Sequence, residues 1–514
     1  MPKVSRGALG AAAVLFAASV ISAGTARADN LLDALTLAYQ TNPTLQEERA
    51  QLRSTDETYV QARAGYRPNA TAKAQASWTW SKYGPNSQSC SLFGVSFCPP
   101  GGIGVDTNNL GGTVSLTQPL FTSGKVTAAV NAAEAKVLSA REDLRQTEAQ
   151  VMLQVIQAYS NVQFDERALD IRKQDTAVLQ HQVEEERARF DVGEVTRTDV
   201  AQTEAQLAQT QALLSTAQSQ LAQDRAAYAA VVGQTPAQLD PAPPFKVFPD
   251  TIDEAFDTVE QNNPALRSAD YLEQAATAQV AEVKAQRAPN VSFGGDYQYG
   301  VPLSPLLQSG AFTRTIDAGV TLQIPIFTGG QLSSQIRQAI EQDNVARTQM
   351  ELVRRTQLQN LSQAWNQMLG ARANKAANKE QVRAATIAFN GTQAEQQVGL
   401  RTTLEVLNAE EVLRSAQLQL AQAEHDEYVA TAGVLGVMGL LEARNLVPGI
   451  SEEPGGHSFN QLKHAFGYVP GVEDGVQTLD SIGQRSIKQL PAPVDAPIIT
   501  GAPEPASAPP AGKP

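Results

Sequence analysis

The chain has 514 residues and a formal net charge of −13, and only 18% of its residues are charged, below the usual ~25% of globular proteins. At about 150 residues per domain, this length predicts roughly three domains. An acidic chain without clusters of lysine and arginine argues against a nucleic-acid partner. Two cysteines exclude a disulfide scaffold, and four histidines leave little for a metal or a histidine-based catalytic site. We therefore expect no cofactor, no metal and no enzymatic activity.

The first 28 residues have the features of a secretory signal peptide. Lys3 and Arg6 give a positively charged start, residues 8–21 form a short apolar stretch, and residues 26–28 (Ala-Arg-Ala) provide small side chains for cleavage. We expect residues 1–28 to be removed. No later run of about 18 apolar residues follows, so the sequence predicts no helical membrane span, and any membrane insertion would need strands.

Several short motifs occur twice in the same order, which indicates two copies of one unit. The early motifs recur at an offset of 221 residues (43 to 264) and the later ones at 206 (119 to 325), so the first copy carries extra residues between 69 and 119. The pairs are Asn42-Pro43 with Asn263-Pro264, Arg67-Pro68-Asn69 with Ala288-Pro289-Asn290, residues 119–124 (PLFTSG) with 325–330 (PIFTGG), and Val192-Gly193 with Val398-Gly399.

These repeats replace the expected three domains by a different division. It is a signal peptide at 1–28, a first repeat at 29–233, a linker at 234–250, a second repeat at 251–445 and a C-terminal segment at 446–514 that ends in a Pro/Ala-rich tail.

Each copy predicts the same order of elements. A moderate helix precedes two strands, a very long helix follows, and a turn containing glycine leads into a returning helix. Apolar residues recur every seven positions in the long helices, as in Val130, Val137 and Val151, which is typical of a coiled-coil seam. The expected helices are 31–65, 122–190 and 196–233 in the first copy, and 253–287, 328–396 and 402–441 in the second.

The strands are recognised by the alternation of apolar and polar residues. The even positions from Ala70 to Trp80 are apolar, and segments 113–117, 291–299 and 315–324 alternate in the same way. A half-buried sheet in a soluble protein would alternate too, but strands of about 10 residues also fit a tilted membrane crossing. Four strands cannot close a membrane barrel, since the smallest have 8, so several chains would have to share one barrel.

Motifs at the joins between these elements point to a family. They are Asn42-Pro43, Arg67-Pro68, residues 118–124 (QPLFTSG) and residues 189–200 (RFDVGEVTRTDV). With the signal peptide and the doubled element order, they make residues 30–445 resemble the TolC family of outer-membrane efflux and secretion ducts.

This resemblance implies a mixed α and β fold. A long antiparallel α-helical coiled-coil barrel would join a transmembrane β-barrel of four strands per chain, closed by trimerisation. Around the middle of the helical barrel, the linker at 234–250 and residues after 443 would form an equatorial belt. It implies a place in the outer membrane of a Gram-negative bacterium, with a large periplasmic portion in contact with a periplasmic adaptor protein and an inner-membrane pump of the ABC or RND type. The expected function is a channel-tunnel for proteins or small molecules.

The glycine turns between the long and returning helices are the expected adaptor-docking tips. Glycine permits the left-handed end of a helix, and Thr196 and Thr402 are suitable caps for the next helix. The tip residues are Val192, Gly193, Glu194, Val195 and Thr196 in the first copy, and Val398, Gly399, Leu400 and Thr402 in the second.

Charged residues after the second tip are the expected gate. Glu405 and Asn408 lie on one helix face and match family positions that line a periplasmic constriction. The resemblance implies that Arg401 latches the closed entrance, with Thr198 and Asp199 as its candidate partners. In a trimer, Glu405 would give a ring of three carboxylates, and negative charges in a narrow pore would favour cations.

Two further features are the cysteines and the tail. Cys90 and Cys98, in an expected extracellular loop, would readily form a disulfide. The segment from about residue 450, with Pro491-Ala492-Pro493 and residues 502–510, is expected to be a disordered, passive tail.

The alternatives come from other classes of protein. A structural periplasmic coiled-coil or adhesin-like rod would explain the helices but not the strands. An enzyme has the least support, because no Gly-x-Ser-x-Gly elbow and no paired metal ligands occur. Acidic pairs such as Glu410 and Glu411 are expected on helix surfaces.

Overall fold

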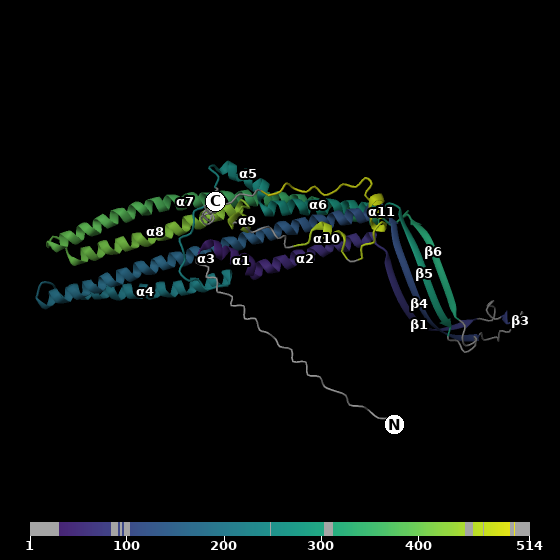
Figure 1. The fold of residues 1–514 in the computed structure, drawn as a ribbon, viewed down its shortest axis with the longest axis horizontal. Helices are drawn as coiled ribbons and strands as arrows, with labels where there is room; N and C mark the ends of the chain where they lie inside the picture. Colours follow the sequence, from purple (N-terminus) through teal and green to yellow (C-terminus); the bar gives the residue numbers. More distant parts are fainter. Residues whose placement is uncertain are drawn as a thin grey trace, which may run out of the picture.

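The fold is taken from a computed structural model, which describes residues 30–83, 91–92, 95–96, 103–246, 248–302, 312–447, 456–465, 467–493 and 498. Figure 1 shows an elongated molecule with long helical hairpins at one end and strands at the other. The predicted signal peptide at 1–28, the cysteines Cys90 and Cys98 and the tail at 502–510 lie outside the described residues, so these predictions stay predictions.

The order of elements follows the two predicted copies, with a C-terminal addition. The helices are α1 (Leu31–Thr41), α2 (Pro43–Arg63), α3 (Lys125–Asp191), α4 (Arg197–Val232), α5 (Ile252–Asn262), α6 (Pro264–Ala285), α7 (Gln331–Gln397), α8 (Thr403–Val437), α9 (Ala443–Leu446), α10 (Phe459–Lys463) and α11 (Val472–Asp480), with a 3-10 helix η1 (Ala64–Tyr66). The strands are β1 (Asn69–Tyr83), β2 (Ser91–Leu92), β3 (Val95–Ser96), β4 (Ile103–Phe121), β5 (Asn290–Pro302) and β6 (Thr313–Gln323).

The prediction of single helices at 31–65 and 253–287 is wrong, because each is divided at its Asn-Pro pair. Pro43 cannot donate the hydrogen bond that would continue α1. The Asn42 side chain accepts from Thr44 N (2.9 Å) and so caps α2, and its amide donates to Val231 O at the end of α4 (2.9 Å).

Asn263 repeats this arrangement in the second copy. It caps α6 through Leu266 N (3.1 Å) and donates to Val437 O at the end of α8 (2.7 Å). The repeated Asn-Pro pair thus begins one helix and ties it to the end of another.

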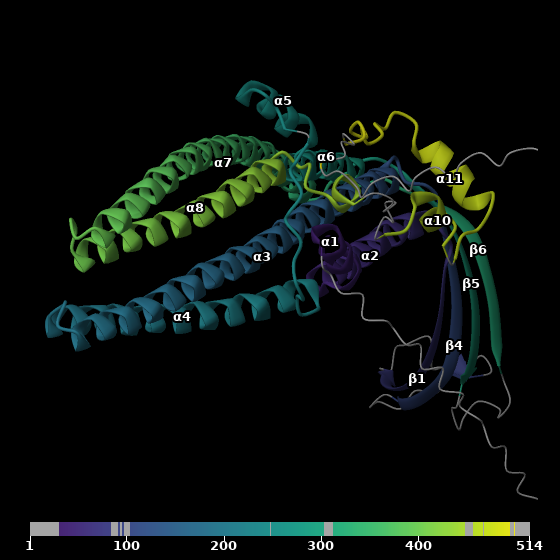
Figure 2. The same ribbon diagram turned by 60° about the vertical axis from the view of Figure 1, so that its left-hand side comes forward.

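The long helices α3 and α7 each have 67 residues and pair with α4 and α8 as antiparallel hairpins. The hairpins lie side by side in the order α4–α3–α8–α7 (Figures 1 and 2). The predicted seam is buried at Val130, Val137 and Val151, and α4 buries Leu221 and Tyr228 together with Thr203 and Thr210. Within the described part of the chain, no helix is both long and apolar enough to cross a membrane.

The strands form an antiparallel sheet in the order β1-β4-β5-β6. Cross-strand pairs Ala76–Leu110, Val114–Tyr297 and Tyr297–Ile316 place the large apolar residues on one face, which we call the apolar face. Its exposed members include Trp78, Trp80, Leu110, Val114, Leu116, Tyr297, Tyr299, Ile316, Val320 and Leu322.

The main hydrophobic core lies midway, where the shorter helices and the linker meet the long hairpins. Tyr159 of α3 and Leu435 of α8 are fully buried there, with residues of α1, α5 and α9. Ile498 joins this core and pairs through its backbone with Asn445 O and Lys246 N (2.8 Å each). The core therefore gathers segments from the linker and from the C-terminal segment.

The expectation of a disordered tail from about residue 450 is wrong for residues 456–493. This segment, which we call the strap, runs along α2, forms α10 and α11 beside the helix ends of the strands, and returns along α6 (Figure 1). Phe459 packs on Tyr59, and Arg267 donates to Pro491 O (2.8 Å). These partners are distant in sequence, which explains why no local pattern predicts the strap.

Candidate functional site

The two helical tips have the same backbone. Gly193 (φ 80°) and Gly399 (φ 79°) are left-handed and end α3 and α7. Glu194 N donates to Arg189 O and Leu400 N donates to Glu395 O, both at 2.9 Å, in the hydrogen-bond pattern of a Schellman motif. An added Cβ would meet nothing at either glycine, so only the left-handed conformation requires glycine.

The predicted caps are confirmed at both tips. Thr196 caps α4 and Thr402 caps α8, and each belongs to a capping box completed by an acidic residue three positions later, Asp199 and Glu405. Glu405 accepts from Thr402 N at 2.9 Å, and Asp199 accepts from Thr196 N at the same distance. Two of the predicted gate residues therefore also stabilise helix ends.

The tips expose apolar side chains. Val192 is 72% exposed, Val398 71% and Leu400 76%. Glu194 is exposed and Val195 half-buried. Exposed apolar side chains gathered on a tip are typical of a contact surface.

Arg401 lies in an exposed charge cluster on the second tip. Its guanidinium donates to Glu395 Oε2 and to Glu405 Oε1, each at 2.8 Å. Hydrogen bonds from the Thr402 backbone and then from Arg401 lower the pKa of Glu405. Hydrogen bonds from Thr196 lower the pKa of Asp199. Both carboxylates therefore stay charged below the usual pH range of their side chains.

Within the described chain, Arg401 is not joined to Thr198 or Asp199. These two residues lie on the first tip, where Asp199 is engaged with Thr196 and Thr198 is exposed. Asn408 is exposed on α8, one turn beyond Glu405. A latch between Arg401 and Asp199 would therefore have to form between neighbouring copies, and it stays a prediction.

Buried carboxylates join the two hairpins near the tips. Thr403 donates to Glu186 Oε1 of α3 (2.9 Å), and Gln182 donates to Glu410 Oε2 (3.0 Å). The expectation that Glu410 lies on a surface is wrong, because α3 covers it and leaves it 2% exposed. Burial raises its pKa. Glu411 remains exposed as expected.

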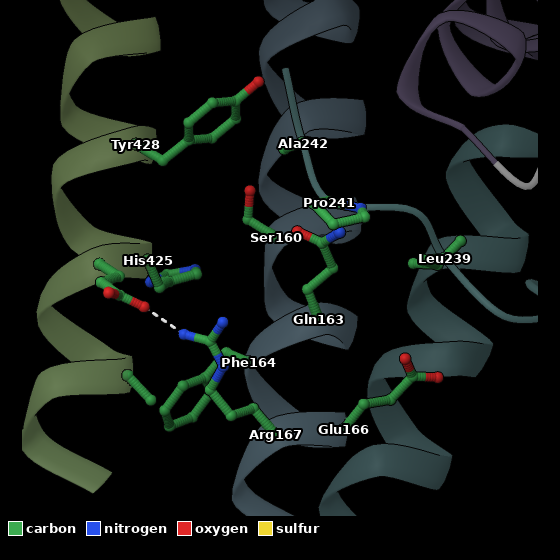
Figure 3. Close-up of a pocket in the computed structure, with 12 residues that line it drawn as sticks. Ser160, Gln163, Phe164, Glu166, Arg167, Leu239, Pro241, Ala242, His425 and Tyr428 are labelled. Carbon is green, nitrogen blue, oxygen red and sulfur yellow. Dashed lines mark hydrogen bonds and ion pairs between the residues drawn. The ribbon is translucent and has the colours of Figure 1, made fainter. Parts of the chain in front are cut away.

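A cavity of about 360 Å³ lies between α3 and α8, beside the linker (Figure 3). Arg167 of α3 pairs with Glu424 of α8 across its wall, and His425 Nε2 lies 2.7 Å from Asn161 Oδ1. These pairs hold the two hairpins together. Among the described residues, no group of three or more potential metal ligands occurs.

The strap carries two buried acidic residues to the junction between strands and helices. Glu473 is fully buried and pairs with Arg63 (2.5 Å) and Arg67 (3.0 Å). Asp480 is 1% exposed and accepts hydrogen bonds from Thr122 N (2.8 Å) and Gly124 N (2.9 Å). Because Gly124 has no side chain to cap α3, Asp480 supplies the missing acceptor.

Sequence reasoning missed Glu473 and Asp480 and explained only part of the Arg67-Pro68 motif. One signal could have pointed to them: acidic residues seven positions apart in a short amphipathic segment, with no basic residue beside them. That pattern indicates one charged helix face that needs a partner elsewhere.

Comparison with known proteins agrees with this architecture. The model of the outer membrane efflux protein family matches residues 34–234 and 255–440. The chain is similar to the outer membrane efflux protein BepC of Brucella suis biovar 1, with 33% identity over 436 residues that cover 85% of this chain and 91% of BepC. It is also similar to the alkaline protease secretion protein AprF of Pseudomonas aeruginosa, with 23% identity over 342 residues, 65% of this chain and 70% of AprF. Among solved structures, VceC of Vibrio cholerae superposes with a TM-score of 0.63 at 23% identity, covering 80% of this chain and 96% of VceC.

The fold and these matches define an outer-membrane export channel with a large periplasmic portion. The chain belongs to the outer membrane efflux protein family. This is a family of transport ducts rather than of enzymes, and the resemblance drawn from the sequence is confirmed.

Proposed function

We propose that three copies of this chain form one duct, in which twelve strands close a β-barrel above a tunnel of long helices. The observation that carries this proposal is the four-stranded sheet, which has one apolar face and leaves β1 and β6 as its edges. Open edges in lipid would leave backbone groups without partners, so neighbouring sheets must supply them. Three is the number of chains that the family resemblance implies.

A mass measurement tests the assembly. The full chain has a mass of 54.8 kDa including residues 1–28. Native mass spectrometry of the detergent-solubilised protein should give three times the mass of one processed chain. A species of one or two chains would contradict the proposal.

A matched pair of variants tests the orientation of the sheet. Val320 lies on the apolar face of β6, and Thr321 lies on the opposite face. Val320→Lys should cost about 2–4 kcal/mol near the bilayer midplane and impair membrane assembly, whereas a lysine in a water-filled lumen costs little. Equal effects of Val320→Lys and Thr321→Lys would contradict a membrane barrel.

The two halves are proposed to be structural repeats within this duct. The capping residues support this, because Thr196 and Thr402, like Asp199 and Glu405, are 206 positions apart (196 to 402). The repeats would span 29–233 and 251–445, the equatorial linker 234–250, and the C-terminal segment 446–514.

The hairpin tips are proposed to receive the periplasmic adaptor. The exposed Val192, Val398 and Leu400 support this, since their apolar side chains lack cover in the described chain. Leu400→Asp should weaken crosslinking to the adaptor while leaving the trimer intact. Arg383→Gln on α7, outside the tips, is the control, because it leaves the apolar contacts in place.

Arg401, Thr198 and Asp199 are proposed to hold the entrance closed, with Glu405 and Asn408 lining it. In a trimer, Glu405 would form a ring of three carboxylates, which attracts cations and repels anions. Glu405→Gln should lower cation preference and block by divalent or trivalent cations in planar bilayers. Glutamine keeps the capping box, so this variant changes charge rather than helix structure.

Conductance tests the latch separately. Arg401→Gln or Asp199→Asn should raise single-channel conductance if these residues tie neighbouring chains together. Arg383→Gln is the control, because the ion pair of Arg383 in the described part of the chain lies within α7, with Glu380 at 2.7 Å. Unchanged conductance in both latch variants would rule out the latch.

The cargo and pump are proposed to be set by the inner-membrane partner, of the ABC or RND type. Relatives support both cargo classes, since AprF is a protease secretion protein and BepC an efflux protein. Crosslinking at the tips followed by identification of the captured pump would decide between them.

A further inference from the structure

Surface helices usually bury apolar side chains and expose charged ones. Helix α11 of the strap departs from this on part of its surface: it buries Val476 as expected, but two acidic residues are buried beside it and other apolar side chains face outward. In α11 the charged Glu473 and Asp480 are 0% and 1% exposed, whereas the apolar Val472, Leu479 and the following Ile482 are 39%, 53% and 76% exposed. We call these three outward residues the apolar stripe.

The apolar stripe cannot be buried by rotation of the helix. Glu473 is held between Arg63 and Arg67, and Asp480 is held by the backbone of Thr122 and Gly124. Turning α11 inward would leave two arginines and the start of α3 buried without their acceptors. The stripe is thus fixed outward by buried charge pairs.

The position of α11 relates the apolar stripe to the apolar face of the sheet. On β4, Gln118 follows Val114 and Leu116 at alternate positions, on the side of the apolar face. Its amide donates to Tyr66 O of η1 (2.9 Å), and α11 contacts both η1 and this end of β4. Helix α11 therefore lies next to the end of the apolar face, and Figure 1 shows it beside the helix-side ends of the strands.

We propose that the apolar stripe of α11 inserts into the periplasmic leaflet of the outer membrane, with phospholipid acyl chains as its partner. An amphipathic helix lying at a bilayer surface buries its apolar face among the headgroups and upper acyl chains. Here the strap fixes the helix at the rim of the sheet, so the junction between strands and helices is anchored to the leaflet. The proposal rests on the proposed membrane sheet and adds to it a contact from outside the repeats.

Spin labels on the full chain can test this proposal. The labels are attached to single cysteines at Leu479, Ile482, Thr478 and Val320, in a chain whose Cys90 and Cys98 are replaced by serine. The protein is reconstituted in vesicles of phosphatidylethanolamine and phosphatidylglycerol. Power saturation then compares collisions with oxygen, which concentrates in lipid, and with a water-soluble nickel chelate. Thr478 is exposed on another side of the same helix and is the matched control.

Labels at Leu479 and Ile482 should collide several-fold more with oxygen than with the nickel chelate, and the label at Thr478 should show the reverse. Val320 reports whether the sheet itself lies in lipid. If Val320 lies in lipid while Leu479 and Ile482 respond like Thr478, the proposal for α11 is wrong and the membrane sheet stands. If Leu479 and Ile482 collide with neither agent, protein covers the stripe and the proposal is also wrong. An aqueous response at Val320 would overturn the membrane sheet and this proposal together.

Discussion

The two strand-to-helix junctions have nearly the same sequence but different surroundings. Residues 119–124 lead into α3, and residues 325–330 lead into α7, with left-handed glycines Gly124 (φ 83°) and Gly330 (φ 86°) before the helices. A Cβ at Gly124 would lie 2.0 Å from the strap residue Gln484, whereas one at Gly330 would meet nothing. The repeat therefore sets the backbone at both junctions, and the strap distinguishes them.

The junction at residues 325–330, which the strap does not cover, leaves apolar side chains exposed. Ile326 is 95% exposed and Phe327 88%, whereas their counterparts Leu120 and Phe121 are half-buried. A repeated sequence can thus encode two different environments when a third segment covers only one of them. In the proposed trimer, the second junction is available to a neighbouring chain.

The largest effect should come from removing the buried acid that holds the strap. Glu473→Ala removes the buried carboxylate that pairs with Arg63 and Arg67, and breaking a buried ion pair in this way typically costs about 3–5 kcal/mol. The free energy of unfolding of the detergent-solubilised full chain, from urea titration followed by circular dichroism, measures this loss. Asp474→Asn, at a half-buried neighbour on α11, should cause a much smaller loss, because asparagine keeps an oxygen that can accept from Tyr468, and equal losses in the two variants would contradict the role of Glu473.

A smaller effect is expected from the acid that caps the first junction. Asp480→Asn replaces charged acceptors for Thr122 and Gly124 by a weaker, partly mismatched amide, which should cost about 1.5–3 kcal/mol. The same urea titration measures it.

Matched threonines sharpen the comparison between the junctions. Thr122 donates to Asp480 Oδ2 (2.7 Å), and within the described residues no such carboxylate contacts Thr328. Thr122→Val should therefore lower the free energy of unfolding much more than Thr328→Val does. Similar losses at both positions would show that the strap does not distinguish the junctions.

The two halves of the chain also differ midway along the long helices α3 and α7, where a buried acid in one half should make stability depend on pH. Glu148 of α3 accepts from Ala443 N (2.5 Å), and the position 206 residues later is the exposed Arg354. Burial raises the pKa of Glu148 to about 7, with Glu442 adding to the rise and Arg49 and Arg444 opposing it. An unfolded glutamate titrates near 4.3.

Because the folded chain holds this proton to higher pH than the unfolded chain, stability should fall as the pH rises from about 5 to 8. The expected change is about 2–3 kcal/mol, and Glu148→Gln should remove it and stabilise the protein at pH 8. Urea titrations at several pH values measure this, with Glu260→Gln, beside Arg354, as the control from the second half. A pH dependence that survives in Glu148→Gln would assign it to another group.

The repeated parts of the fold could be predicted from the sequence because their signals are local. Seven-residue spacing marked α3, and alternation marked the strands. The tips were predictable because glycine and a capping threonine act within one turn. The helix break at Asn42 was missed, since α1 and α2 share one apolar pattern across it.

The strap and its contacts could not be predicted, because they depend on distant partners. Glu473 lies about 410 positions from Arg63, and nothing in the local pattern of either residue indicates the other. The burial of Glu410 was missed for the same reason, since α3 of the first copy covers α8 of the second.

The smallest predicted effect concerns the tips, where the two copies should behave alike. Thr196→Ala and Thr402→Ala each remove one capping hydrogen bond from an exposed helix start, which costs about 1 kcal/mol. Hydrogen exchange of the first-turn amides of α4 and α8 should therefore accelerate by a similar factor, roughly fivefold, in the respective variants.

A clear difference in hydrogen exchange between Thr196→Ala and Thr402→Ala would have a specific structural source. Among the residues that the structure describes, the second tip alone has a contact like that of Thr403 with buried Glu186 of α3, which would hold the start of α8 even after its cap is lost. A markedly smaller effect of Thr402→Ala should then rise to that of Thr196→Ala when Thr403→Val is added. If the added change has no effect, the tips are equivalent, and the asymmetry of the molecule is confined to the parts that the strap and the linker contact.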